Sequence, residues 1–224
     1  MAIIDAVVRT RSDRVKSLIE QYSDTIIDRV KERVDDVKIE IMNTLGAIIK
    51  ALFETTRAQS IERDLMHHTS IVRMASVGEQ LKSKQAKITK VLVKQMKSKN
   101  KKVKVAAIDT LSIFTNLTQF LMDKQFNDFW PELSKTIDDR SCFEPTLSAL
   151  SVLRRLFRAR DLKSTQPAIF ATHADAITAF LKKAIEHEYS KVVYEGLRVS
   201  SSFLNALRNS ATGTVDPAYS KSVN

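Results

Sequence analysis

Few residue types in this sequence could carry catalysis or bind a metal ion, and their spacing does not suit either role. Two histidines on one helical face would need to lie four positions apart to share a metal ion, whereas the first two here are adjacent. The single cysteine, Cys142, has no histidine at ligand spacing, and a nucleophilic thiol needs a base beside it. We therefore expect an inert thiol buried in the helix predicted at 144–157, and solvent-exposed histidines in loops. The histidines are His67, His68, His173 and His187.

The glycines do not form a phosphate-binding loop, which needs clustered glycines so that backbone amides can approach the anion. The four glycines, Gly46, Gly78, Gly196 and Gly213, are scattered singly. Gly46 and Gly196 fall inside predicted helices, where a missing side chain lets neighbouring helices approach closely. The sequence therefore predicts a protein that is not an enzyme and has no small-molecule substrate, cofactor or metal ion.

Lysine is the residue type whose spacing does suggest a function. Between Lys82 and Lys104 there are ten lysines and no acidic residue, so this segment matches the net charge of +10 of the whole chain. Four of the lysines recur at steps of three, four and three, which places them on one face of a helix. We name these four residues the lysine stripe: Lys87, Lys90, Lys94 and Lys97.

Apolar residues occupy the opposite side of the same helix, so the lysine stripe is predicted to face solvent. A second basic group ends the helix predicted at 144–157, where the helix dipole favours positive charge. Both groups fit either a binding surface for an acidic partner or a solvated face that keeps the protein soluble. Nucleic acid is the less favoured partner, because no aromatic side chain lies among the lysines and no known DNA- or RNA-binding signature is present. The partner-binding candidates are the lysine stripe together with Arg154, Arg155 and Arg158.

The composition favours an all-helical fold. The 224 residues include only 4 glycines and 4 prolines, with 7% aromatic residues and abundant Leu, Ile, Val, Ala and Lys, which suits helices better than strands. No apolar run approaches the ~20 residues that cross a bilayer, so we expect no membrane contact. The single cysteine and the lack of a signal-peptide pattern indicate a reducing compartment, which we expect to be cytoplasmic, nuclear or both.

A repeated motif predicts how the helices are organised. The segments VKIEIMNTLGAII (37–49) and VKVAAIDTLSIF (103–114) share a frame that EPTLSALSVLRRLF (144–157), VVYEGLRVSSSFL (192–204) and the opening IIDAVV also fit. The aligned positions lie 38, 66, 39 and 47 residues apart. Three of these spacings match the period of roughly 40 to 47 residues of HEAT and armadillo repeats. The aligned residues are Val7, Leu45, Leu111, Leu150 and Leu197, and we expect the four leucines to be buried between paired helices.

The predicted fold is an all-α HEAT-repeat solenoid, an α-α superhelix of about four helix pairs that spans residues 1–208. One unpaired helix at residues 2–9 precedes the pairs and leaves an apolar face uncovered, so we expect the chain to be part of a longer array. The spacing of 66 requires an insertion, which we place in a polar loop at about 54–75 with at most a short helix. Residues 209–224 are predicted to be a linker-like tail. The predicted turns carry residues that suit helix caps, namely Asp35, Asp36, Asn100, Asp138 and Asp139.

Several segments resemble the cullin-associated and neddylation-dissociated protein family of long HEAT-repeat solenoids. These segments are IDAVVRTRSD (4–13), IIDRVKERVDDVKIEI (26–41) and VLVKQMKSKNKKVK (91–104), and the likeness continues in order through DTLSIF, SALSVL and HEYSKVVYEGLRV. The lysine enrichment and the segment 54–75 depart from the family's pattern, so partner contacts are not transferred to individual positions.

The resemblance implies a non-enzymatic protein that wraps an unneddylated cullin and its RING subunit. It also implies masking of the lysine that accepts the ubiquitin-like modifier, and exchange of the substrate receptors of cullin-RING ubiquitin ligases. Two other functions use the same repeat and stay open at this point. One is a segment of a nuclear-transport receptor or phosphatase scaffold, and the other is a basic HEAT protein whose binding to nucleic acid would weaken steeply as salt rises.

Overall fold

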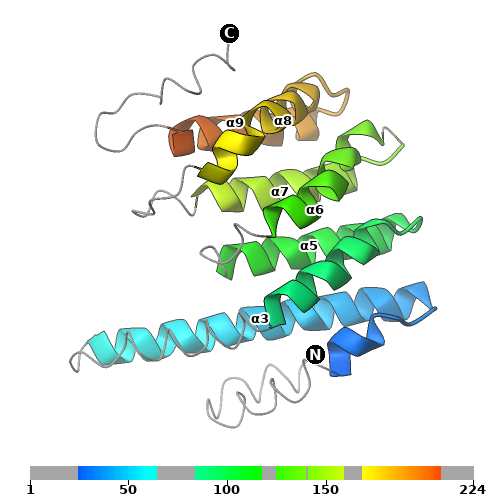
Figure 1. Ribbon diagram of the computed structural model, residues 1–224, viewed down its shortest axis with the longest axis vertical. Coiled ribbons are helices and arrows are strands. Elements are labelled where there is room, and N and C mark those ends of the chain that lie inside the picture. The colour runs from blue at the N-terminus through cyan, green and yellow to red at the C-terminus, as the bar shows by residue number, and fades with distance from the viewer. Residues whose placement is uncertain (1–24, 65–83, 118–124, 140, 159–167, 208–224) are drawn as a thin grey trace. The chain divides into compact units, whose positions relative to one another are not determined.

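The computed structural model describes residues 25–64, 84–117, 125–139, 141–158 and 168–207 (Figure 1). Within these ranges every regular element is a helix and none is a strand, which confirms the predicted all-α class. The chain divides into two compact units, residues 1–121 and 122–224. Each unit is built from helices that follow one another in pairs across short turns, as in a HEAT-type repeat.

In the first unit, α3 (Asp35–Asp64) packs along α5 (Lys101–Leu117), as Figure 1 shows. A helix described at 84–96 precedes α5 and is joined to it by the turn at 97–100. The hydroxyl of Thr110 in α5 donates a hydrogen bond of 3.0 Å to the carbonyl of Met42 in α3, so a polar contact accompanies the apolar packing. The largest fully buried apolar side chains of this unit include Met42, Leu45, Ile49, Leu92, Ile108, Leu111 and Phe114.

The second unit begins with α6 (Phe126–Ser134), which contains Pro131 and passes directly into the 3-10 helix η1 (Lys135–Asp138). It continues with α7 (Glu144–Arg158), α8 (Ala168–Ile185) and α9 (Ser190–Leu207), and α9 packs on both α7 and α8. Aromatic rings reinforce the packing. Those of Phe157 and Phe203 lie 5.0 Å apart, and those of Trp130 and Phe180 lie 5.8 Å apart, within the range of favourable aromatic pairs.

Helices α5, α7 and α9 share one register of buried positions. They begin at Lys101, Glu144 and Ser190, which lie 43 and 46 residues apart, and in each helix the third, seventh, tenth and fourteenth residues are buried. The fourteenth residue is a phenylalanine in all three helices. These residues are Val103, Ala107, Thr110 and Phe114 in α5, Thr146, Leu150, Leu153 and Phe157 in α7, and Val192, Gly196, Val199 and Phe203 in α9.

The predicted alignment of leucines does not follow this register, because Leu111 is the eleventh residue of α5, Leu150 the seventh of α7 and Leu197 the eighth of α9. Leu45, Leu111 and Leu150 are buried as expected, but Leu197 is 53% exposed on α9. The buried residue at that point of α9 is Gly196, which holds the seventh position that Leu150 holds in α7. Matching leucine to leucine displaces the frame by four residues between α5 and α7 and by one residue between α7 and α9, because the helices share the spacing of buried positions and not the residue type.

The expectation that Gly46 and Gly196 permit close helix contacts is confirmed. A Cβ atom on Gly46 would lie 3.1 Å from Cδ1 of Ile113 in α5. A Cβ atom on Gly196 would lie 3.1 Å from Cβ of Ala184 in α8 and 3.3 Å from its carbonyl carbon. All three distances are shorter than ordinary van der Waals contact, so these two helix pairs approach closely because the glycines have no side chain.

The predicted loop at 54–75 is wrong over its first half, because α3 continues as a helix to Asp64. The segment ETTRAQSIERD (54–64) is polar and poorly periodic, but it contains no glycine or proline that would end a helix. Residues 65–75, the predicted helix at 2–9 with Val7, and the predicted tail at 209–224 lie outside the described residues. Within the described ranges, no helix is long and apolar enough to span a membrane.

Candidate partner-binding surfaces

The helix at 84–96 separates its apolar and charged residues as the sequence predicts. Ile88, Leu92 and Met96 are almost fully buried, and Val91 is half-buried. All four residues of the lysine stripe are exposed, which confirms that the stripe faces solvent. Because the apolar face of this helix is buried against the core, the lysines on the opposite face are left exposed to solvent.

One end of the lysine stripe is paired with an acid of the short helical segment at 25–29, which precedes α3. The Nζ atom of Lys87 lies 3.2 Å from Oδ1 of Asp28, and both side chains are largely exposed. Asp28 lies far from Lys87 in the sequence, so the spacing of the lysines alone gave no sign of this pair. Lys87 is therefore a weaker candidate for a partner contact than Lys90 and Lys94, for which no ion pair is found among the described residues.

Hydrogen bonds fix the turn that follows this helix. The side-chain amide of Gln95 is buried and donates to the carbonyl of Val30 at 3.2 Å. The Oδ1 atom of Asn100 accepts from the backbone N–H of Lys102 at 3.0 Å, which is the predicted capping role at the start of α5. The Nδ2 atom of Asn100 also donates to Oδ2 of Asp35 at 2.9 Å. The first turn of α3 thereby holds the first turn of α5.

Asp35 is the charged centre of this contact. Its Oδ1 atom accepts from Nζ of Lys38 at 2.7 Å, while its other oxygen accepts from Asn100. The hydrogen bond from Lys38 and, after it, the hydrogen bond from Asn100 stabilise the carboxylate and hold the pKa of Asp35 below its usual value. Asp35, which the sequence predicts as a helix cap, is the first residue of α3, and its side chain joins the start of α3 to Asn100 at the start of α5.

The arginine candidates are tied into the second unit to different degrees. Nη1 of Arg154 in α7 lies 3.1 Å from Oε2 of Glu195 in α9, and both side chains are 24% exposed. Glu195 also accepts from Arg198 at 3.2 Å, and the Arg198 guanidinium lies over the ring of Tyr194. Arg155 is half-buried, and Arg158 is the last residue of α7. Arg154 therefore joins α7 to α9. A role of Arg154, Arg155 or Arg158 in partner binding stays a prediction.

The structure corrects two expectations about the residues that could carry chemistry. His173 lies on α8 and not in a loop, with Nε2 2.6 Å from Oδ1 of Asn127 and its ring against Phe126. Cys142 precedes α7 and is only half-buried, and its thiol donates to Oε2 of Glu144 at 3.0 Å. His67 and His68 lie outside the described residues. In the part of the chain that the structure describes, no three His, Cys, Asp or Glu residues are grouped so that they could hold a metal ion.

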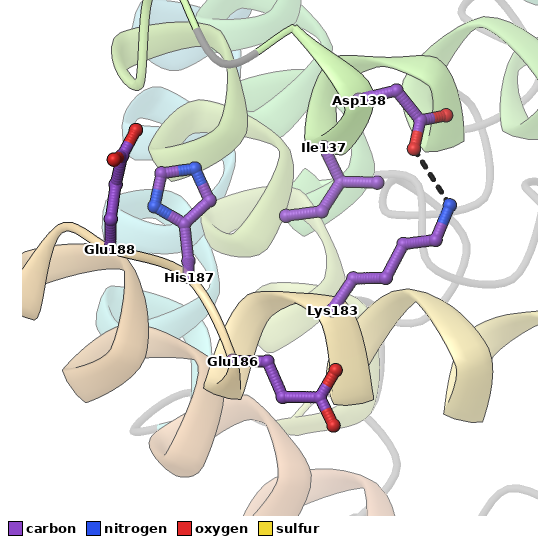
Figure 2. A pocket seen from close by; sticks show the side chains of 6 residues that line it. All are labelled: Ile137, Asp138, Lys183, Glu186, His187 and Glu188. Carbon is purple, nitrogen blue, oxygen red and sulfur yellow. Dashed lines mark hydrogen bonds and ion pairs between the residues drawn. The ribbon is translucent and has the colours of Figure 1, made fainter.

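The second unit has a cleft of about 360 Å³ at the turn between α8 and α9, shown in Figure 2. An ion pair of 2.7 Å between Asp138 and Lys183 closes one side of it. His187 is half-buried, and its Nδ1 atom accepts from the backbone N–H of Tyr189 at 3.1 Å. The cleft is lined by Ile137, Asp138, Lys183, Glu186, His187 and Glu188. With Glu186 and Glu188 exposed, this turn has an acidic character, in contrast to the lysine-rich turn of the first unit.

Comparison with known proteins supports the resemblance at the level of a distant relative. No family model matches the chain. Over 204 residues the chain is 24% identical to Cullin-associated NEDD8-dissociated protein 1 of Arabidopsis thaliana. The similarity covers 91% of this chain, whereas the chain spans only 16% of the length of that relative. The likeness therefore runs along nearly the whole chain but concerns a small part of the larger protein.

Proposed function

We propose that this chain is a non-enzymatic, helical-repeat binding segment that holds an unneddylated cullin together with its RING subunit. The observation that carries the proposal is the similarity over 91% of the chain to a protein named for its association with cullins. The repeated register of α5, α7 and α9 supports it, because stacked helix pairs present extended surfaces to large partners. By the same similarity we propose a contribution to the assembly of cullin-RING ubiquitin ligases and to the exchange of their substrate receptors.

The lysine stripe is proposed to guide the encounter with an acidic surface of this partner. Exposed charges at the rim of an interface act mainly on the association rate, because they steer the approach of the two proteins. Lys90 and Lys94 are the stronger members, since Asp28 already faces Lys87 at 3.2 Å. The rigid apolar face beneath the stripe lets these charges be changed without disturbing the core.

Binding of the full chain to a purified cullin–RING complex tests the proposed function. The complex is prepared with and without covalently attached NEDD8 and immobilised, and the chain is passed over both forms. We expect binding to the unmodified complex and clearly weaker binding to the modified one. Absence of binding to both forms, or equal binding to both, would refute the proposal.

A pair of matched variants tests the stripe within the same assay. Replacing Lys90 and Lys94 by Glu is expected to slow association and reduce its dependence on salt. The control replaces Lys182 and Lys191 by Glu, which are exposed lysines of the second unit and change the net charge by the same amount. Equal association rates for both variants would show that the stripe is a solvated face.

Nucleic acid is the second candidate partner, because ten lysines without an acid between residues 82 and 104 would also attract phosphates. Titration of duplex DNA at rising salt separates the two functions. Tight binding that weakens steeply with salt, without binding to the cullin–RING complex, would favour nucleic acid.

A further inference from the structure

The densest group of exposed lysines surrounds the turn between the helix at 84–96 and α5. Four lysines lie within six consecutive residues, and all four are exposed. Two of them lie in the turn at 97–100, and the other two are the first two residues of α5. We name this group the lysine corner: Lys97, Lys99, Lys101 and Lys102.

The backbone under the lysine corner is fixed, while the side chains extend into solvent. Asn100 sits at its centre, where Oδ1 accepts from Lys102 N–H and Nδ2 donates to Asp35. The backbone N–H of Asn100 also donates to Oγ of Ser98 at 3.2 Å. The carbonyl of Asn100 accepts from the N–H of Lys104 at 3.1 Å. The corner therefore holds its lysines together before any partner arrives, which lowers the entropic cost of binding.

Two members of the lysine corner, Lys99 and Lys102, carry charge that no ion pair offsets among the described residues. The nearby carboxylate of Asp35 is already occupied by Lys38 and Asn100. No ion pair joins Lys99 or Lys102 to an acid among the described residues. The start of α5 adds the positive end of the helix dipole, and this helix has no acidic residue in its first turn. Lys99 and Lys102 therefore hold positive charge that is not offset by an ion pair with a described residue, unlike Lys87 at the end of the lysine stripe.

We propose that the lysine corner binds a run of aspartate and glutamate residues in a flexible segment of the partner protein. This inference rests on the proposed function, because it assigns the acidic run to the protein that the scaffold holds. A lysine ammonium is a compact charge on a mobile side chain and imposes no bidentate geometry. The lysine corner should therefore bind a partner segment according to how many negative charges it holds close together. A flexible acidic segment suits such a surface because it can rearrange its own carboxylates.

The surrounding sequence favours an acidic peptide over nucleic acid. No aromatic residue lies between Lys82 and Lys104, so this segment offers no ring on which the bases of a single strand could stack. It also contains no arginine, the residue that binds phosphates in a bidentate manner. A partner with many carboxylates needs neither feature.

The test uses the full chain and a short, fluorescently labelled peptide of alternating Asp and Glu, with fluorescence anisotropy as the readout. The corner variant carries Lys99→Glu and Lys102→Glu. The control variant carries Lys182→Glu and Lys191→Glu, and Lys191 is the second residue of α9 as Lys102 is the second residue of α5. At low salt we expect the corner variant to bind about tenfold more weakly, and the control variant to change by less than about twofold.

Four results would overturn the inference, three with the peptide and DNA and one with the cullin–RING complex. If both variants bind the peptide equally weakly, only the net charge of the chain matters. If neither variant differs from wild type, the lysine corner does not contact the peptide. Tighter binding of duplex DNA than of the acidic peptide at the same salt would assign the corner to nucleic acid. The same chains are then tested on the cullin–RING complex. Binding of the peptide at the corner without binding of the complex refutes the proposed function alone, whereas equal binding of the complex by wild type and corner variant refutes only the inference.

Discussion

At the scale of single residues, two helical glycines differ in what a side chain would meet. A Cβ atom on Gly196 would press on Cβ and the carbonyl carbon of Ala184, and a helix backbone cannot move aside cheaply. A Cβ atom on Gly46 would meet the flexible end of Ile113. We predict that Gly196→Ala lowers the free energy of unfolding by about 1 to 3 kcal/mol through overpacking. Gly46→Ala should be neutral or stabilising by up to about 1 kcal/mol, because alanine favours a helix.

Urea denaturation of the two glycine variants beside the wild type measures this difference. Each variant is the control of the other, since both add one methyl group within a helix. If Gly196→Ala proves as stable as Gly46→Ala, then α8 and α9 are not in close contact at that point.

The aligned leucines give a second comparison at this scale. Leu111 is fully buried, so Leu111→Ala should cost about 2 to 5 kcal/mol. Leu197 is 53% exposed, so Leu197→Ala should change stability by no more than about 0.5 kcal/mol. Thermal and chemical unfolding of both variants and the wild type measure these two changes in stability. A large loss of stability in Leu197→Ala would contradict the exposure of Leu197 and the burial of Gly196 beside it.

How far the sequence predicts single residues depends on whether their environment is local. The outward position of the lysine stripe follows from helical periodicity, and the capping role of Asn100 follows from its place at a helix start. The pairing of Lys87 with Asp28 and of Arg154 with Glu195 joins residues on different helices. No local pattern encodes such pairs, because they depend on which helices become neighbours.

At the scale of elements, Asp35 couples the start of α3 to the start of α5. Because its pKa is lowered in the folded state, Asp35 contributes stability above its unfolded value, which is near 3.8, and this contribution is lost as pH falls through the lower folded value. We predict that Asp35→Asn destabilises the chain near neutral pH. The difference from wild type should shrink as the pH falls from about 4 through the lower folded pKa, because the carboxylate of the folded wild type is protonated only there.

Chemical denaturation at several pH values between neutral and acid measures this linkage. Asp36→Asn is the matched control, because Asp36 is the neighbouring exposed acid of the same helix turn. A constant difference between Asp35→Asn and wild type across the whole range would contradict the role of the charge. The asparagine side chain at position 35 would then destabilise the chain through its shape or hydrogen-bond geometry and not through the lost charge.

The boundaries of elements were predicted less well than their existence. The polar segment 54–64 looked like a loop because its hydrophobic periodicity fades, yet α3 extends to Asp64. Apolar periodicity is only one signal of a helix, and a polar segment without glycine or proline can continue a helix in which that signal is weak. The position of α5 is predicted better, because its apolar residues are buried and keep a helical period.

The repeat was likewise predicted better in its existence than in its exact spacing. The predicted intervals of 39 and 47 differ from the 43 and 46 residues that separate the starts of α5, α7 and α9. The sequence comparison matched residue types, whereas the fold repeats a pattern of buried positions that Ala107, Leu150 and Gly196 fill with different side chains. The helix-repeat class was nevertheless predictable, because it rests on the periodicity of many residues.

At the scale of the whole molecule, the net charge of +10 is concentrated in one segment. Salt should therefore act on stability and on binding in opposite directions. Raising the ionic strength from about 0.01 M to about 0.15 M shortens the screening length from roughly 30 Å to roughly 8 Å and weakens repulsion among the lysines. We predict a higher melting temperature for the wild type at the higher salt and, for the same reason, weaker binding of an acidic partner.

The charge variants give this prediction its control. Replacing Lys99 and Lys102 by Glu relieves repulsion and places an acid in the first turn of α5, where the helix dipole favours it. Replacing Lys182 and Lys191 removes the same charge, but Lys182 lies in the last turn of α8, where a cation is favoured. The first variant should therefore melt higher than the second at low salt, and the gap should narrow as salt rises. A wild type that melts lower when salt is added would mean that favourable ion pairs outweigh repulsion, and that the lysine corner is balanced within the fold rather than kept for a partner.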